Sequence, residues 1–220
     1  MQMSSEKIRG IIIRENFSGE SDKFLTIFAK DKGKISVFAK GARNTRSKFL
    51  ASSSLFTYGD FIIRTVTKTP TLLTADVIES FYNIRNDFAT AVYASCFAEF
   101  IDKALIEKVP DNNALLLLLK SLQKLSKENA EPRLTGCIFH LRFLDILGYR
   151  PDDEILSSLS ATGHSAALYI LSSPLNKAFN ISLDTVYISE LETFIEKYID
   201  YHMDIKLKSY KIIKDLLLTN

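Results

Sequence analysis

Residues 23–40 read KFLTIFAKDKGKISVFAK and predict a β-hairpin. Two runs rich in β-branched and aromatic residues, Lys23–Lys30 and Lys34–Lys40, flank the short connection Asp31-Lys32-Gly33. Such runs favour strands, and a short connection that contains glycine favours an antiparallel pair. This hairpin therefore predicts that the surrounding segment is a β-sheet.

Similar runs lie on both sides of this hairpin, at Lys7–Arg14, Leu55–Thr65 and Thr71–Glu79. Five short strands in one small segment suit a closed barrel, because closure removes the exposed edges of an open sheet. We expect an OB-fold first and an SH3-like barrel second. The connection between the third and fourth strands, residues 41–54, is long, rich in serine and basic.

After residue 81 the sequence pattern becomes helical. Apolar residues recur at intervals of three and four, which is typical of helices with one buried face. Predicted helices run from about Phe88 to before Pro110, from Asp111, from Pro132 to Gly148, over His164–Ser172, from a capping box at Ser189 and Glu192, and over Ser209–Leu218. These helices predict an all-α bundle.

The expected fold is therefore α+β, with two domains. Residues 1–80 are predicted to form an OB-fold domain that binds nucleic acid. Residues 81–220 are predicted to form a helical domain, in which 152–188 is a less regular insertion region.

The composition is that of a globular protein. Hydrophobic residues make up 46% of the chain and charged residues 25%, which excludes collagen-like and low-complexity classes. No apolar run approaches the roughly 18 residues of a membrane span, and the N-terminus has no apolar signal core. With only two cysteines, we expect a soluble, cytoplasmic protein without a disulfide framework or a membrane partner.

Positive charge is concentrated near the predicted hairpin. Between residues 30 and 48 a single anion, Asp31, accompanies seven cations: Lys30, Lys32, Lys34, Lys40, Arg43, Arg46 and Lys48. Such a density repels itself unless a polyanion or solvent disperses it, so nucleic acid is the leading partner. The alternative is an ordinary solvated surface.

Four aromatic residues lie in or beside this basic stretch: Phe38, Phe49, Phe56 and Tyr58. Aromatic rings can stack on nucleic-acid bases, although most of these rings must fill the barrel interior. Phe49, next to Lys48, is the best candidate for stacking.

No catalytic group is evident. The three histidines, His140, His164 and His202, are not at metal-ligand spacing, and no Ser/His/Asp grouping can be assembled. Cys96 and Cys137 fall on apolar helix stripes and are expected to be reduced core residues. The Gly19–Asp22 segment fits a turn. We therefore expect no enzyme, no metal and no cofactor; a metal-dependent phosphodiesterase using Glu20, Asp22 and Asp60 is the least favoured alternative.

Short motifs are spread along the chain in a fixed order. The motifs are Gly19-Glu20-Ser21-Asp22-Lys23, Lys32-Gly33-Lys34-Ile35, Ala39-Lys40-Gly41-Ala42-Arg43, Lys48, Phe56 with Gly59, Glu79-Ser80-Phe81, Leu141-Arg142-Phe143-Leu144, Leu147-Gly148-Tyr149-Arg150-Pro151, Tyr201-His202 and Leu207-Lys208-Ser209. Each motif is short, but in their colinear order they resemble the RecO family of bacterial recombination mediators.

The resemblance implies a nucleoid-associated protein that binds single- and double-stranded DNA and anneals complementary strands. It also implies partners: RecR, the acidic C-terminal tail of single-stranded DNA-binding protein and, indirectly, RecA. Many RecO proteins carry a four-cysteine zinc module after the segment that matches Leu147–Pro151. Here residues 152–158 read DDEILSS, and no cysteine follows, so we predict no zinc.

The predicted DNA-binding residues are Lys32, Lys34, Lys40, Arg43, Arg46, Lys48 and Phe49. The predicted partner-binding residues are Arg142, Lys206 and Lys208. Arg142 could instead pair with Asp145 on its own helix. The alternative function is an adaptor whose helices hold protein partners and whose barrel binds RNA or no nucleic acid.

Overall fold

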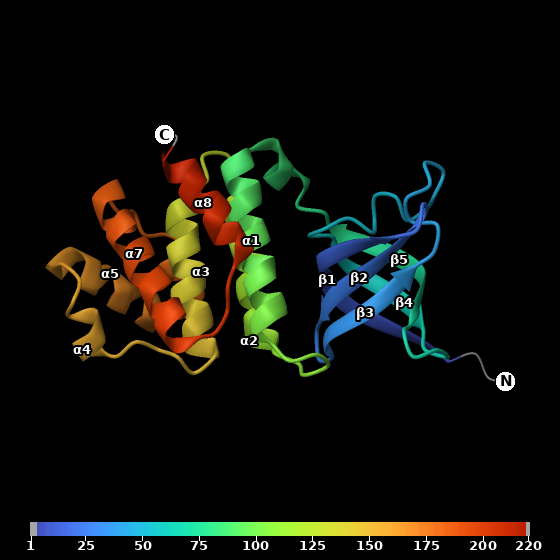
Figure 1. The fold of residues 1–220 in the computed structure, drawn as a ribbon, viewed down its shortest axis with the longest axis horizontal. Coiled ribbons are helices and arrows are strands. Elements are labelled where there is room, and N and C mark those ends of the chain that lie inside the picture. The colour runs from blue at the N-terminus through green and yellow to red at the C-terminus, as the bar shows by residue number, and fades with distance from the viewer. Residues whose placement is uncertain (1–3, 219–220) are drawn as a thin grey trace. The chain divides into compact units, whose positions relative to one another are not determined.

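The computed structural model describes residues 4–218, with side chains described to residue 213. The N-terminal strands β1 (Ser5–Ser18), β2 (Asp22–Ala29), β3 (Gly33–Ala39), β4 (Tyr58–Arg64) and β5 (Thr71–Glu79) form a closed barrel in the order β1-β2-β3-β5-β4 (Figure 1). All neighbouring pairs are antiparallel except β3 and β5. The predicted five-stranded OB-fold barrel is confirmed.

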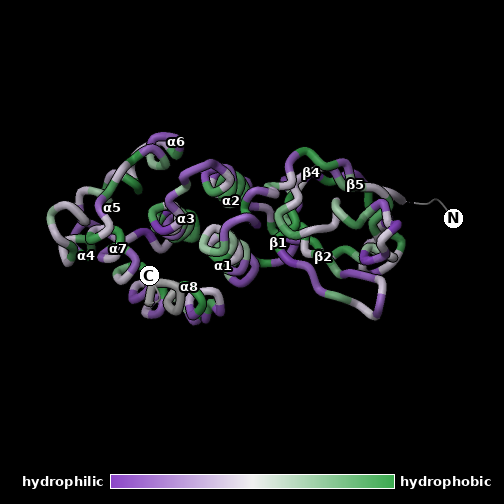
Figure 2. Tube along the Cα trace, turned by 90° about the horizontal axis from the view of Figure 1, so that it is seen from above, coloured by the Kyte–Doolittle hydropathy of each residue, from purple (hydrophilic) through white to green (hydrophobic). Residues whose placement is uncertain are grey.

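Alternate residues of the strands fill the barrel. The interior side chains come from all five strands, and they include Ile8, Ile12, Leu25, Ile27, Val37, Phe61, Ile63 and Leu72. Figure 2 shows the hydrophobic stretches that recur along β1, β2 and β4. Because side chains alternate between the two faces of a strand, the intervening residues lie on the outer wall.

The turn between β2 and β3 requires Gly33. Its φ is +72°, in the left-handed region, and a Cβ atom there would collide with the backbone of Val109. The Lys108 N–H also donates to the Lys34 carbonyl at 3.1 Å. The hairpin therefore packs directly against the segment that follows the first long helix.

The rest of the chain is helical, as predicted. The elements are a 3-10 turn (Tyr82–Asn86), α1 (Phe88–Ala104), α2 (Asn112–Leu125), α3 (Pro132–Ile146), α4 (Asp153–Leu156), α5 (Ala161–Ser172), α6 (Leu175–Ala178), α7 (Thr185–His202) and α8 (Lys208–Leu218). Helix α3 packs against α5 and α7. It also meets α1 through the Phe97 and Phe139 rings, whose centroids are 4.1 Å apart.

The predicted capping box at Ser189 and Glu192 is wrong. Helix α7 begins one turn earlier, at Thr185, and Asp184 is its N-cap residue. Ser189 lies inside the helix and donates to the Thr185 carbonyl at 3.0 Å. The spacing of a capping box also occurs within a helix, so the local pattern could not distinguish the two positions.

The chain forms two compact units. One contains the residues up to Phe81 together with Ile101–Leu115, and the other contains Tyr82–Phe100 together with the residues from Leu116 onward. The segment after α1 thus belongs with the barrel. In the described part of the chain, no helix combines the length and hydropathy that a membrane crossing needs.

Candidate nucleic-acid interface

The connection between β3 and β4 is a loop of consecutive turns. Its backbone N–H groups at Asn44, Ser47 and Leu50 each donate to the carbonyl three residues earlier, at 2.9–3.1 Å. Phe49 anchors the loop by inserting its ring into the barrel core. The basic segment therefore has a defined shape, although it contains no strand or helix.

This loop is also tied to the turn between β1 and β2. The Asp22 carboxylate accepts the Gly41 N–H at 2.6 Å, and the Arg43 N–H donates to the Ser21 carbonyl at 2.9 Å. The Arg43 guanidinium donates to the Gly19 carbonyl at 3.1 Å. Asp22 thus supports the basic loop, in agreement with the turn predicted for Gly19–Asp22.

Four of the predicted DNA-binding residues line one hollow. It is a shallow space of about 350 Å³ lined by Lys40, Arg46, Lys48 and Phe49. Lys40 and Arg46 are exposed, and neither forms an ion pair with any described residue. Residues 40–57 contain four cations and no carboxylate, so this surface is suited to binding anions.

The two remaining cations of the loop, Lys48 and Arg43, lie against aromatic rings. The Lys48 ammonium donates to the Leu73 carbonyl at 2.8 Å and lies 4.9 Å from the centre of the Phe49 ring. The Arg43 guanidinium lies 4.3 Å above the Phe17 ring. Cation–π contacts of this kind hold a cationic group in place without neutralising its charge.

The structure does not place Lys34 in this interface. Its side chain is buried, with a relative exposure of 5%, and its ammonium donates to the Asp102 carbonyl. It also pairs with the Asp102 carboxylate at 3.4 Å. The predicted phosphate contact at Lys34 is therefore contradicted, because an acidic residue from α1 neutralises it.

Lys32 lies in the turn between β2 and β3 and is exposed. Its ammonium pairs with the Glu6 carboxylate. Lys32 does not line the hollow formed by Lys40, Arg46 and Lys48. The predicted set of six cations thus separates into a cluster on the loop and two lysines with carboxylate partners.

Phe49 is not available for stacking in this structure. Only 7% of its surface is exposed, because the ring belongs to the barrel core. Phe56 is also buried, whereas Phe38 and Tyr58 are half-buried. The expectation that Phe49 is the best stacking residue is therefore contradicted: the loop turns inward at this position, and sequence position alone could not show that.

Two of the three acidic residues considered for metal-dependent chemistry, Asp22 and Asp60, have structural roles. Asp60 accepts hydrogen bonds from Arg9 at 2.7 and 2.9 Å and pairs with Lys7 at 3.0 Å. These hydrogen bonds hold the pKa of the Asp60 carboxyl well below its usual range. Within the described residues, no three His, Cys, Asp or Glu side chains are arranged to hold a metal ion.

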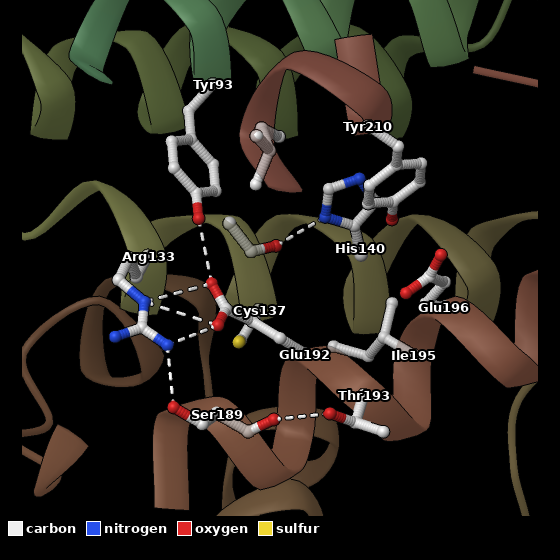
Figure 3. A pocket seen from close by; sticks show the side chains of 12 residues that line it. Tyr93, Arg133, Cys137, His140, Ser189, Glu192, Thr193, Ile195, Glu196 and Tyr210 are labelled. Carbon is white, nitrogen blue, oxygen red and sulfur yellow. Dashed lines mark hydrogen bonds and ion pairs between the residues drawn. The ribbon is translucent and has the colours of Figure 1, made fainter. Parts of the chain in front are cut away.

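The helical unit contains a separate cavity of about 360 Å³ between α1, α3, α7 and α8. In Figure 3 the Tyr93 hydroxyl and the Arg133 guanidinium both point at the Glu192 carboxylate. Tyr93 donates to Glu192 at 2.8 Å, and Arg133 reaches it at 2.5 Å. Burial and the Glu192 charge raise the pKa of Tyr93. Glu192 thus already neutralises the arginine in this cavity.

Arg142, Lys206 and Lys208 do not line the cavity. The half-buried Arg142 donates to the carbonyls of Leu171 and Ser173 at the end of α5. Arg150 binds Asp145 instead, at 3.3 Å. Arg142 therefore stabilises a helix C-terminus, and the alternative considered for it, an ion pair with Asp145, does not form.

Lys206 and Lys208 are exposed. The backbone N–H of Lys208 donates to the Glu99 carboxylate at 2.9 Å, and Ser209 also donates to it. This carboxylate caps the N-terminus of α8. The Lys208 ammonium is not involved in that cap. Sequence reasoning missed Glu99 and the Arg133–Glu192 pair, because each joins helices far apart in the chain.

Comparisons with known proteins agree with this architecture. The family model for the N-terminal part of recombination protein O matches residues 3–81, and the model for its C-terminal part matches residues 85–154. Together these matches cover the barrel and α1–α3.

Individual relatives are similar over the same region. The DNA repair protein RecO of Acetivibrio thermocellus is 40% identical over 149 residues, which cover 68% of this chain and 59% of the relative. RecO of Bacillus pumilus is 35% identical and RecO of Bacillus mycoides 34% identical, each over 146 residues, or 66% of this chain. The aligned region spans less than two thirds of these relatives' own length. From the two family models and these relatives, the chain belongs to the RecO family.

Proposed function

We propose that this protein is a non-enzymatic DNA repair protein that binds DNA and anneals complementary single strands. With RecR it would help load RecA onto gapped DNA in recombinational repair. Residues 1–80 would serve as the DNA-binding domain. Residues 81–220 would serve as the domain that meets protein partners, including the acidic tail of single-stranded DNA-binding protein.

The observation that carries this proposal is the carboxylate-free basic loop on an OB-fold barrel. Lys40, Arg46 and Lys48 surround one hollow, and Arg43 lies beside it on the Phe17 ring. OB-fold barrels bind oligonucleotides on such loops and strands. The names of the relatives, which are DNA repair proteins, agree with a DNA ligand for this surface.

Annealing follows from electrostatics in this scheme. Two complementary strands repel each other through their phosphates, and a cationic surface that holds one strand lowers this repulsion for the other. The chain makes and breaks no covalent bond in this process. Its contribution is a fixed array of positive charge held by the turns of residues 40–57.

The test is fluorescence anisotropy with a labelled single-stranded oligonucleotide at several salt concentrations. Four phosphate contacts predict a log–log slope of about −3. The double variant Arg43→Glu/Arg46→Glu should bind much more weakly at low salt and only slightly more weakly at high salt. Salt-independent binding, or none, would overturn the proposal.

A matched control separates the loop from overall charge. Lys120 and Lys177 are exposed lysines on α2 and α6, so Lys120→Glu/Lys177→Glu changes the net charge by the same amount. This control should bind nearly as well as the parent protein. If both double variants lose affinity equally, general attraction rather than the loop accounts for binding.

A second assay addresses annealing and partners. Complementary strands coated with single-stranded DNA-binding protein should anneal faster when this protein is added. The acceleration should be smaller when the single-stranded DNA-binding protein lacks its acidic C-terminal tail. Competition between DNA and RNA strands of matched sequence tests the adaptor alternative, because an RNA reader would use the 2′-hydroxyl.

A further inference from the structure

Two aromatic rings form a pair on the outer wall of the barrel. Phe24 on β2 and Phe38 on β3 are directly paired across the two strands. Their ring centroids are 5.1 Å apart with planes inclined at 50°. The adjacent residues Leu25 and Val37 are fully buried in the core. Alternation along the strands therefore places the two rings outside it.

This position is unusual for phenylalanine. Phe24 has 37% of its surface exposed, and Phe38 is half-buried. Large aromatic side chains usually fill cores or interfaces, because their burial contributes strongly to stability. An exposed aromatic pair on a sheet is therefore a candidate binding surface.

The pair adjoins the basic loop. Lys40 follows Phe38 by two residues, immediately after β3 ends. Asp22 precedes Phe24 by two residues and holds the Gly41 N–H at 2.6 Å. Strand β2 thus carries the carboxylate that holds the first turn of the loop, and β3 leads directly into the loop.

A third exposed ring lies at the same end of the barrel. Phe17 near the end of β1 is 66% exposed and carries the Arg43 guanidinium 4.3 Å above its ring. Its strand partner is Lys23, whereas Phe24 pairs with Asn16. Alternation along the strands therefore places Phe17 on the opposite face of the sheet from Phe24 and Phe38.

We propose that Phe24 and Phe38 stack the unpaired bases of a single DNA strand whose phosphates bind the basic loop. This inference rests on the proposed function and adds which form of DNA the surface takes. A stacking ring needs the exposed face of a base, which a duplex conceals. The cations of the adjoining 40–57 loop favour a nucleic acid over an apolar protein segment as the ligand, because that loop has no carboxylate to balance them.

Two oligonucleotides of equal length and charge test the idea: oligo-dT and an abasic strand that has phosphates and sugars but no bases. The parent protein should bind oligo-dT roughly tenfold more tightly for each ring that stacks a base. The salt dependence should be the same for both, since the phosphate contacts are shared.

The variant Phe24→Leu/Phe38→Leu keeps an apolar surface and removes both rings. It should bind the two strands almost equally while retaining the parent's salt slope. Phe17→Leu removes a ring on the opposite face of the sheet and should leave the preference for oligo-dT unchanged. Ile78 on β5 is also exposed, so Ile78→Ala is the control for loss of an apolar surface residue and should leave the preference unchanged.

The outcomes separate the two proposals. If the parent protein binds neither strand, the proposed DNA-binding function fails. If it binds both strands equally and with a steep salt slope, DNA binding stands and base stacking is overturned. If Phe24→Leu/Phe38→Leu, with the parent's melting temperature, still prefers oligo-dT as strongly as the parent does, then these two rings are not the stacking surface.

Discussion

Basic groups have opposite environments in the basic loop of residues 40–57 and in the helical unit. In the loop, Lys40 and Arg46 are exposed and unpaired among the described residues. In the helical unit, Arg133 is held by Glu192, and Arg142 by two helix-end carbonyls. The comparison shows that Lys40 and Arg46 are accessible to a ligand, because they are exposed and no described carboxylate pairs with them.

His140 is a further basic side chain of the helical unit that is shielded from solvent. It is fully enclosed in the helical unit, where its ring packs against Phe97, Phe100 and Phe139. Its Nδ1 and the Gly136 carbonyl oxygen are 2.7 Å apart. Burial disfavours the charged form of an imidazole and lowers the pKa of His140 to about 4. In the helical unit, His140 thus serves packing, and Arg133 and Arg142 serve internal pairing.

The largest expected effect concerns stability in the helical unit. Arg133→Ala leaves the Glu192 carboxylate without its main partner in a partly buried site. We expect the free energy of unfolding to fall by about 3 kcal/mol, as when one partner of a buried pair is removed. Urea denaturation measures this change. Arg46→Ala in the loop is the control and should change the free energy of unfolding by less than about 0.5 kcal/mol. Equal losses of stability in the two variants would contradict the difference between the loop and the helical unit.

A smaller effect is expected from pH. The folded-state pKa of His140 lies below its unfolded value of 6.5, so the unfolded chain binds a proton more readily between those values. Stability should therefore fall as pH decreases, by about 2 kcal/mol between pH 7 and pH 5 from this group. Denaturation at both pH values, in the parent and in His140→Leu, measures it. A variant with the same pH dependence as the parent would contradict the assignment.

The smallest effects compare two lysines within the barrel unit. Lys34→Ala removes a buried partner of Asp102, which retains Arg14 at 2.7 Å. It should lower stability by about 1 kcal/mol and leave DNA affinity within roughly twofold of the parent. Lys40→Ala should do the reverse, with weaker binding and unchanged stability. Thermal melting and anisotropy on both variants provide the comparison, and a similar loss of affinity in both would place Lys34 in the interface.

Much of the fold follows from local sequence. The two β-rich runs around Asp31-Lys32-Gly33 are β2 and β3, and Gly33 has the left-handed φ that the turn needs. The fourth strand begins later than expected, at Tyr58. Phe56, within the predicted strand, has a φ of 67° and belongs to the loop. Runs of β-branched and aromatic residues predict the existence of strands well. They do not predict where a strand begins when a single residue at the edge of the run, such as Phe56, has a left-handed backbone conformation.

The binding residues were less predictable. The positive charge of residues 40–48 could be predicted from the sequence, because no acidic residue lies within that segment. The acceptor of Lys34 is Asp102, 68 residues away, and Arg142 binds carbonyls 29 and 31 residues away. Local patterns carry no information about such partners. Phe38 was one of four aromatic candidates for stacking, but its outward pairing with Phe24 could not be predicted, since each residue lies in an ordinary alternating strand.

By itself, the sequence determined the succession of a β-barrel and a helical bundle and the positive charge of one loop. These properties depend on side-chain periodicity and on neighbours along the chain. Only the tertiary structure decided which cations remain unpaired and open to solvent and which rings lie outside the barrel. Burial and ion pairing are set by residues that folding brings together from distant positions, and their effect on a charge falls steeply with distance.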